Sequence, residues 1–277
     1  IATDKVVRAG GDYYMISRSL GLDTGGAVGI PLYFAQALSV ALYTIGFAES
    51  VNNIFPNASI VVIALITTVL VTALALTSAD AAIKAQYVIM AAIALSLIAL
   101  IFGHDVEPLA SDAASSQVVR VGFRAVLAVF FPAVTGIMSG VNKSGDLKDP
   151  IRSIPRGTIA AVVVGYVIYM AIPFILTIRT PTAPAPLLNP NVMVMKRIAL
   201  GGQFMIDSIV LGVWGATLSS AIGSILGAPR ILQALARDNI LHNSLRWLGK
   251  GNGPTDDPRL GTLFTLGIVL AVVMMGS

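Results

Sequence analysis

The chain has 277 residues, of which 56% are hydrophobic and only 12% are charged, and its formal net charge is +4. Soluble domains contain roughly 45–50% apolar and about 25% charged residues, so this composition excludes an ordinary soluble protein and indicates a polytopic membrane protein. The sequence contains no cysteine, which excludes disulfides, thiolate metal ligands and a cysteine nucleophile within it.

Seven apolar segments approach the roughly 20 residues that a helix needs to cross a bilayer. Their expected bounds are 29–51, 58–78, 85–103, 121–141, 157–178, 204–228 and 261–276. A bundle of such helices buries its core against itself and against lipid. We therefore predict a single all-α transmembrane domain that covers residues 1–277.

The basic residues predict how these spans are oriented, because cytoplasmic loops carry the excess of lysine and arginine. When alternate loops are assigned to opposite sides, thirteen of the eighteen lysines and arginines fall on one side, including Lys5, Arg18 and Arg237. We expect that side to be cytoplasmic. The basic residues lie in short loops and form no stripe with interleaved aromatics, so nucleic-acid binding is not expected.

Both ends of the sequence suggest a piece of a longer protein. The first residues, IATDKVVRAGG, hold neither an initiator methionine nor a signal peptide, and the last, TLFTLGIVLAVVMMGS, stop inside an apolar run. We expect the chain to be a fragment of something longer.

The first span carries a tyrosine and an acid at unusual depths. Tyr43 falls near the middle of 29–51, where its hydroxyl needs a buried partner, and this favours a polar role over that of an interfacial tyrosine. Glu49 is the one acid inside this span. A carboxylate within a membrane suggests a functional role and needs a partner for its charge. The alternative is that Glu49 has no such role and extends its side chain to the outer interface.

The fourth span contains helix breakers in the stretch FFPAVTGIMSG. Pro132 has no N–H and deprives the carbonyl of Ala128 of its helical partner, while Gly136 permits a turn. Carbonyls before such a break favour a cation and free amides after it favour an anion, as in the discontinuous helices of secondary transporters. The alternative is an ordinary proline kink, with Thr135 bonding back to the preceding turn.

Three small residues in GATLSSAIG predict a second polar position. Ala216, Ser219 and Ser220 are related as i, i+3 and i+4, so they share one helical face. Two hydroxyls and a carbonyl are the kind of oxygens that a sodium ion binds. The alternative is close helix packing, for which membrane helices use small residues at this same spacing.

Four stretches, in this order, resemble the sodium-, potassium- and chloride-coupled cation-chloride cotransporters. They read GGDYYMISRSLGLDTGGAVG, ALYTIGFAES, FFPAVTGIMSGVNKSGDLKDPIRSIPRGT and ATLSSAIGSILGAPRILQALARDNI. The resemblance covers most of the chain. It implies the fold of the amino acid–polyamine–organocation superfamily, a five-plus-five inverted repeat with broken first and sixth helices. The present spans would be its third to ninth helices, and 121–141 the broken sixth.

The resemblance also implies ion-binding roles. A potassium site would use the Tyr43 hydroxyl, with Pro132 and Thr135 as its companions on the broken helix. A chloride would bind backbone amides, and the residues concerned are Gly136, Ile137 and Met138. Met138 stands where the family has leucine, which matters little for a backbone contact.

The serine pair bears on the coupling ion. In the family, adjacent serines mark the sodium-coupled branch, so Ala216, Ser219 and Ser220 are the implied sodium ligands. Glu49 resembles the acid that closes the extracellular gate by pairing with an arginine of the first helix, which lies outside this sequence.

The function implied is electroneutral symport of sodium, potassium and chloride by alternating access in the plasma membrane, with no cofactor beyond the transported ions. Lipid and inorganic ions are the expected partners, and a homodimer is left open. The alternatives are an amino acid or polyamine transporter of the same superfamily, a sodium-chloride symporter without potassium, and a transport-inactive membrane scaffold. An enzyme is not expected, since no zinc motif, nucleophile elbow or phosphate loop occurs.

Overall fold

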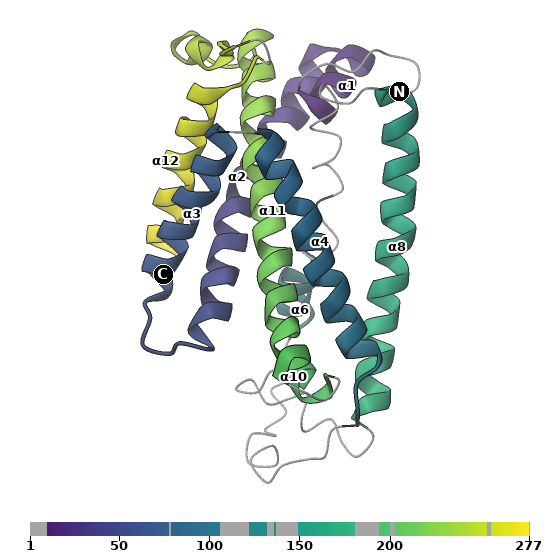
Figure 1. Cartoon of the computed structure of the whole chain (residues 1–277). Helices are drawn as coiled ribbons and strands as arrows, with labels where there is room; N and C mark the ends of the chain where they lie inside the picture. The colour runs from purple at the N-terminus through teal and green to yellow at the C-terminus, as the bar shows by residue number, and fades with distance from the viewer. Residues whose placement is uncertain are drawn as a thin grey trace. The chain divides into compact units, whose positions relative to one another are not determined.

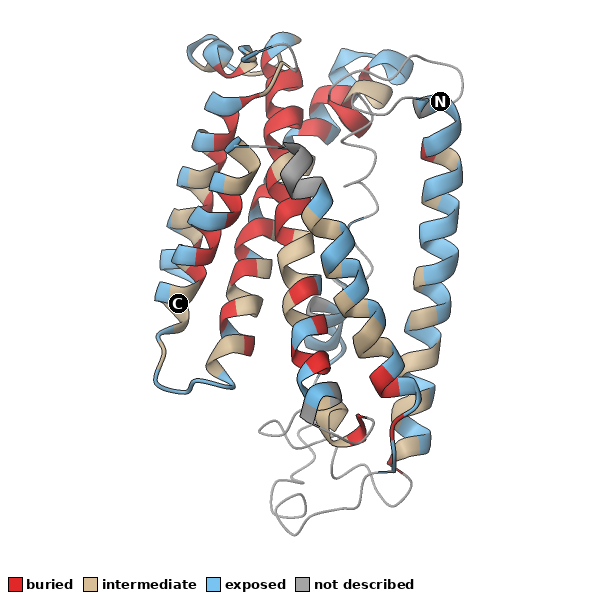
Figure 2. Ribbon diagram, viewed as in Figure 1, coloured by how far each residue is buried: buried red, intermediate tan, exposed pale blue. Residues whose placement is uncertain are grey.

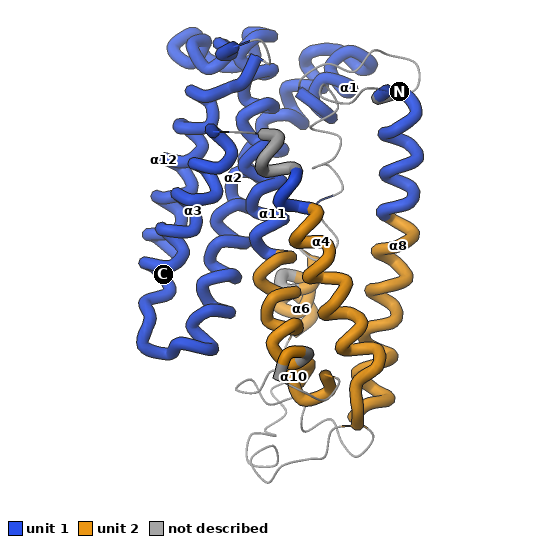
Figure 3. The backbone as a smooth tube through the Cα atoms, viewed as in Figure 1, with its two compact units in different colours: residues 1–86, 136–161, 217–277 blue, residues 87–135, 162–216 orange. Residues whose placement is uncertain are grey.

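The computed structural model describes residues 10–77, 79–105, 122–131, 136, 149–180, 194–199, 203–253 and 256–276. Every named element within these residues is a helix, which confirms the predicted all-α class (Figure 1). The chain forms two compact units (Figure 3). The first comprises residues 1–86, 136–161 and 217–277, and the second residues 87–135 and 162–216.

Among the described residues, five helices are long and apolar enough to cross a membrane. They are α2 (Leu22–Asn52), α3 (Ile60–Thr77), α4 (Ala79–Ile101), α8 (Pro150–Arg179) and α11 (Gln203–Arg237). A sixth apolar helix, α12 (Arg259–Met275), has 17 residues. Each of the six overlaps one predicted span. The protein is therefore an integral, multi-pass membrane protein, as the composition indicated.

The predicted span 121–141 lies mostly outside the described residues. Its described part consists of α6 (Phe123–Phe130), Phe131 and Gly136. α6 begins after Gly122, whose backbone is extended, and its first turn contains Arg124.

In the first unit, α2 packs against α3, α12 and the short helix α1 (Gly11–Leu20). The core joins α1 and α2 to the C-terminal part of α11 and to the 3-10 helix η3 (Asn243–Gly249), and includes Tyr13, Tyr33, Ile231, Leu235 and Leu248. Figure 2 shows this part of α11 as almost continuously buried.

Two hydrogen bonds between hydroxyls link α2 to its neighbours. The Tyr33 hydroxyl lies 3.2 Å from the Thr265 hydroxyl of α12, and the Thr68 hydroxyl of α3 donates to the Thr44 hydroxyl at 3.0 Å. All four residues are buried. Such bonds satisfy polar groups where no water is present and strengthen helix association inside a membrane.

Close backbone approach fixes α1 on α2. A Cβ added to Gly25 would lie 2.8 Å from the Ser17 Cα, and one added to Gly29 would lie 2.5 Å from the Tyr13 ring. Neither site has room for a side chain. Small residues at the crossing of two helices allow this contact.

The second unit has its own core at one end of α4. Ala99 and Leu100 pack with Ile198, Ala199 and Ile209, which belong to α10 (Val194–Ile198), the residue after it and α11. The backbone N–H of His104 donates to the carbonyl of Ile198 at 2.9 Å.

An ion pair lies beside this core, between Arg179 at the end of α8 and Asp105. The Nη1 atom of Arg179 is 3.2 Å from Oδ1 of Asp105. Both side chains are partly exposed, so the pair contributes little to stability.

α8 exposes large apolar side chains along its length, among them Val163, Tyr166, Met170 and Phe174 (Figure 2). In a soluble protein such a surface would drive aggregation. On a helix of this length such a surface is compatible with contact with lipid, since hydrocarbon solvates these side chains as well as a protein core does.

Candidate functional site

The segment predicted to bind ions through its backbone does not continue as one helix. Phe131 is still right-handed helical, with φ −55° and ψ −42°, and its N–H donates to the carbonyl of Leu127. Gly136 has φ +103°. A right-handed helix cannot include that conformation, so the helix that begins at Phe123 ends before Gly136.

The backbone conformation alone explains glycine at position 136. A Cβ there would meet no atom within 4 Å, so packing does not require a small residue. The positive φ does require glycine, because residues with a side chain rarely adopt this backbone conformation. The other candidates of this segment, Pro132, Thr135, Ile137 and Met138, lie outside the described residues.

Tyr43 lies in the C-terminal half of α2 and is half-buried. The next residue, Thr44, is buried; its hydroxyl donates within α2 to the carbonyls of Val40 and Ala41 and accepts from Thr68. α2 therefore carries polar side chains at the depth where the potassium ligand is predicted. Pro132 and Thr135, the predicted companions of Tyr43, lie outside the described residues.

The three predicted sodium ligands lie on α11, which is helical from Gln203 to Arg237. The helical spacing therefore places Ala216, Ser219 and Ser220 on one face. Both serines are half-buried and Ala216 is exposed. Within a continuous helix the carbonyl of Ala216 keeps one lone pair free of the helical hydrogen bond, so it can still serve as a cation ligand. Three oxygens make only part of a shell, and the rest must come from other segments.

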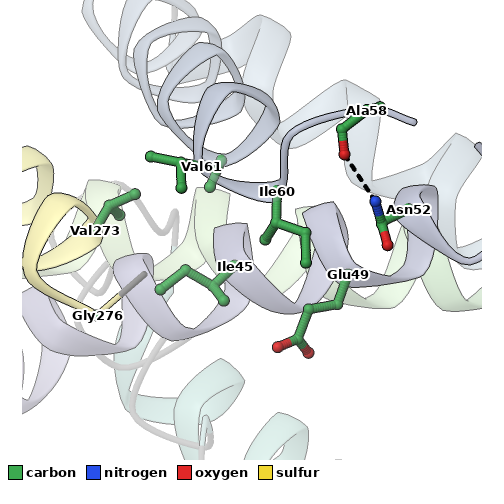
Figure 4. Close-up of a pocket in the computed structure, with 9 residues that line it drawn as sticks. Ile45, Glu49, Asn52, Ala58, Ile60, Val61, Val273 and Gly276 are labelled. Atoms are coloured by element: carbon green, nitrogen blue, oxygen red, sulfur yellow. Dashed lines mark hydrogen bonds between the residues drawn. The ribbon is translucent and has the colours of Figure 1, made fainter. Parts of the chain in front are cut away.

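Glu49 lies in the last turn of α2, is exposed, and lines a pocket of about 400 Å³ (Figure 4). The other lining residues are mainly apolar: Ile45, Asn52, Ala58, Ile60, Val61, Ala64, Val273 and Gly276. The Asn52 amide donates to the carbonyl of Ala58 at 2.7 Å and fixes the turn between α2 and α3. Within the described part of the chain Glu49 has no ion-pair partner, and its gating role stays a prediction.

Sequence reasoning missed a polar network at the C-terminal end of α11. The Tyr13 hydroxyl donates to Oδ2 of Asp238 at 2.8 Å, and Nη2 of Arg18 donates to Oδ1 at 2.8 Å. Both oxygens of Asp238 therefore bind α1. Burial and the bond to Asp238 raise the pKa of the Tyr13 hydroxyl well above its usual range, so it remains a donor.

A second pair extends this network toward the loop before α12. Arg237 binds Asp256 with two nitrogens, at 2.6 and 2.7 Å, and its Nε donates to the carbonyl of Gly249 at 2.8 Å. This bidentate bond lowers the pKa of Asp256. Residues far apart in sequence form these contacts, and no local spacing could have indicated them.

We expect Asp238→Asn to destabilise the protein by about 1–3 kcal/mol, because it removes the charge that binds Arg18 and weakens the bond to a fully buried tyrosine. The unfolding midpoint of the purified full-length protein should fall by several degrees. Asp105→Asn, which removes the more exposed pair with Arg179, is the matched control and should have a clearly smaller effect. Equal shifts in the two variants would contradict the importance of the α1 contact.

No group of three or more histidine, cysteine or acidic side chains suited to a metal ion occurs among the residues that the structure describes. The ligands predicted from the sequence for sodium and potassium are hydroxyls and carbonyls. Weakly bound, transported ions favour such neutral oxygens.

Comparison with known proteins identifies the family. A family model described as Amino acid permease matches residues 1–277. Human solute carrier family 12 member 1 is 32% identical over an alignment of 338 positions, which covers all of this chain and 30% of that protein. Mouse and zebrafish solute carrier family 12 member 2 are 32% and 31% identical, again over all of this chain and over 27% and 29% of those proteins. The chain thus spans less than a third of the length of these relatives.

Permeases and solute carriers are transporters, which confirms the expectation that the protein is not an enzyme. The solute carrier family 12 relatives also confirm the resemblance drawn from the four sequence stretches. The chain belongs to the amino acid permease family and, within the amino acid–polyamine–organocation superfamily, to its cation-chloride cotransporter branch.

Proposed function

We propose that the protein is a secondary-active symporter of the plasma membrane that moves sodium, potassium and chloride together without net charge. The observation that carries this proposal is Gly136, whose φ of +103° ends the helix that begins at Phe123 within an apolar segment. Non-helical backbone is tolerated at membrane depth only where it is buried in protein or lines a wet cavity. Such a segment offers free peptide groups to ions.

The potassium ion would bind oxygens at this break. Tyr43 would supply its hydroxyl, Pro132 a backbone carbonyl and Thr135 a hydroxyl. Neutral oxygens can replace the hydration shell of potassium without holding the ion too tightly for release. The half-buried position of Tyr43 on α2, beside the buried Thr44, supports a polar role for its side chain.

Chloride would bind the amides that follow the break, those of Gly136, Ile137 and Met138, because free N–H groups at a helix start favour an anion. Sodium would bind Ala216, Ser219 and Ser220 on α11. No cofactor is needed, since the gradients of the ions themselves drive transport. Alternating access would come from one group of helices rocking around ions held near the midplane.

Rubidium uptake by the full-length protein tests this proposal. Rubidium replaces potassium, and its uptake should require sodium and chloride in the same medium. Removing either ion should reduce uptake to the background of untransfected cells, and membrane potential should have no effect. Uptake that persists without sodium or without chloride would contradict coupled symport.

Amino acid transport is the second candidate, favoured by the description of the family model that matches the whole chain. It predicts that an external amino acid accelerates the exit of preloaded amino acid and that chloride is irrelevant. The two candidates therefore differ in a single experiment, in which chloride is replaced by gluconate.

A further inference from the structure

Asp12 is a buried acid that has no role in the proposed transport. It lies in the first turn of α1 and is only 6% exposed. Its Oδ2 atom is buried and has no hydrogen-bond partner among the described residues. An ionised carboxylate in this position is costly, because burial removes its hydration and no donor among the described residues bonds to Oδ2 in place of the lost water.

The first turn of α1 is held in place on both sides of Asp12. Gly10 and Gly11 have φ values of +114° and +51°, and a Cβ at Gly10 would come within 2.8 Å of the Ala234 Cβ on α11. Tyr13 is fully buried against α2 and α11. Exposing the Asp12 carboxyl to water therefore requires that the start of α1 separates from these helices.

Several charged groups near α1, among the residues that the structure describes, bind partners other than Asp12. Asp238 binds Tyr13 and Arg18, and Arg237 binds Asp256. The titratable and charged residues of α1 and of the helix parts packed against it are Tyr13, Tyr14 and Arg18 on α1, Asp23 and Tyr33 in the N-terminal part of α2, Arg230 and Arg237 in the C-terminal part of α11, and Asp238 directly after it. Burial alone raises the pKa of Asp12 to about 6.

We propose that Asp12 is a proton-binding site whose protonation tightens the packing of α1 against α2 and α11. The direction of the pH effect on packing follows from the linkage between proton binding and packing. The folded pKa is about 6 and the exposed value 3.8, so the packed state binds the proton more strongly. The packing of α1 is strongest in acid, weakens as the pH rises between these two values, and changes little above about pH 6.

On our assignment of the loops, α1 lies on the cytoplasmic side, so acidification of the cytoplasm would stabilise its packing. Proton binding by Asp12 does not depend on the proposed symport. Asp12→Asn mimics the protonated acid at nearly constant shape, and Asp23→Asn is the matched control, because Asp23 is an exposed acid in the first turn of α2.

Infrared spectroscopy of the full-length protein tests proton binding directly. The C=O band of a protonated carboxyl should titrate with a midpoint near pH 6, should be absent from Asp12→Asn and should remain in Asp23→Asn. A band that Asp12→Asn retains, or a midpoint near the ordinary value of 3.8, would overturn the proposal. So would a midpoint that depends on whether sodium, potassium or N-methylglucamine is the buffer cation, because the ligand would then be a metal ion.

Hydrogen exchange of the α1 amides tests the effect on packing. At each pH we divide the exchange rate of the unsubstituted protein by that of Asp12→Asn. This ratio cancels the intrinsic pH dependence of exchange. From the two pKa values, the ratio should rise about tenfold between pH 5 and pH 7. When the exchange rate of the unsubstituted protein is divided by that of Asp23→Asn, the ratio should not change with pH. A flat ratio against Asp12→Asn, or failure of that variant to fold, would show that the site does not favour the neutral form.

Discussion

Replacing Ser219 and Ser220 together by alanine is expected to abolish the sodium dependence of transport while leaving the amount of folded protein unchanged. Both hydroxyls lie on one face of a continuous α11 and are half-buried. A hydroxyl bound to a charged partner contributes about 1.5–3 kcal/mol, so losing two should weaken sodium binding by on the order of a hundredfold or more. The measurement is rubidium uptake by the full-length protein as a function of sodium concentration.

The same variant separates the sodium site from the packing alternative. Alanine is as small as serine, so a face that serves only helix packing should tolerate both replacements. Ser208→Ala is the control, because Ser208 is a buried hydroxyl elsewhere on α11 and is not a predicted ligand. Unchanged sodium affinity in the double variant would remove the basis for a sodium site, and loss of sodium dependence in Ser208→Ala would indicate a general packing defect.

The transmembrane helices could be predicted because long apolar stretches have few other stable arrangements. Their ends could not. α2 begins at Leu22 rather than 29, and α11 continues to Arg237 rather than ending at 228. Hydropathy reports the part of a helix that lies in hydrocarbon, whereas its hydrogen bonds continue into the polar region as long as the side chains permit.

α1 and its contacts could not be predicted from a single sequence. Its mixed composition gives no apolar run, and sequence reasoning treated Arg18 and Arg237 as topology determinants only. Asp238 binds Tyr13 across 225 positions of sequence. Such a contact depends on which helices are neighbours in space, and neither periodicity nor spacing carries that information. The burial of Asp12 could not be predicted for the same reason.

Those parts of the candidate site that lie within a single segment could be predicted from the sequence. Pro132 and Gly136 predicted an interruption, and the conformation of Gly136 is incompatible with a continuous helix. The shared face of Ala216, Ser219 and Ser220 follows from their spacing once α11 is continuous. A complete ion shell draws ligands from several helices, so its geometry needs tertiary information that a spacing rule cannot supply.

Gly136→Ala is expected to reduce coupled uptake at least tenfold. A residue with a Cβ adopts a φ near +103° only at a cost of about 1–3 kcal/mol, so alanine should shift the segment toward a helical or extended backbone. Either change would turn the amides of 136–138 away from the position where chloride is proposed to bind. The expected signature is a rise in the chloride concentration needed for half-maximal rubidium uptake, larger than any change in the sodium requirement.

Gly267→Ala distinguishes this effect from a general intolerance of alanine in apolar segments. Gly267 lies inside α12 with helical backbone, and a Cβ there would meet no atom within 4 Å. Since alanine is favoured over glycine in a helix by up to about 1 kcal/mol, this control should fold at least as well and transport normally. If Gly136→Ala transported as well as Gly267→Ala, the positive φ would serve no purpose in chloride binding. The proposed anion site would then have to be sought away from this segment.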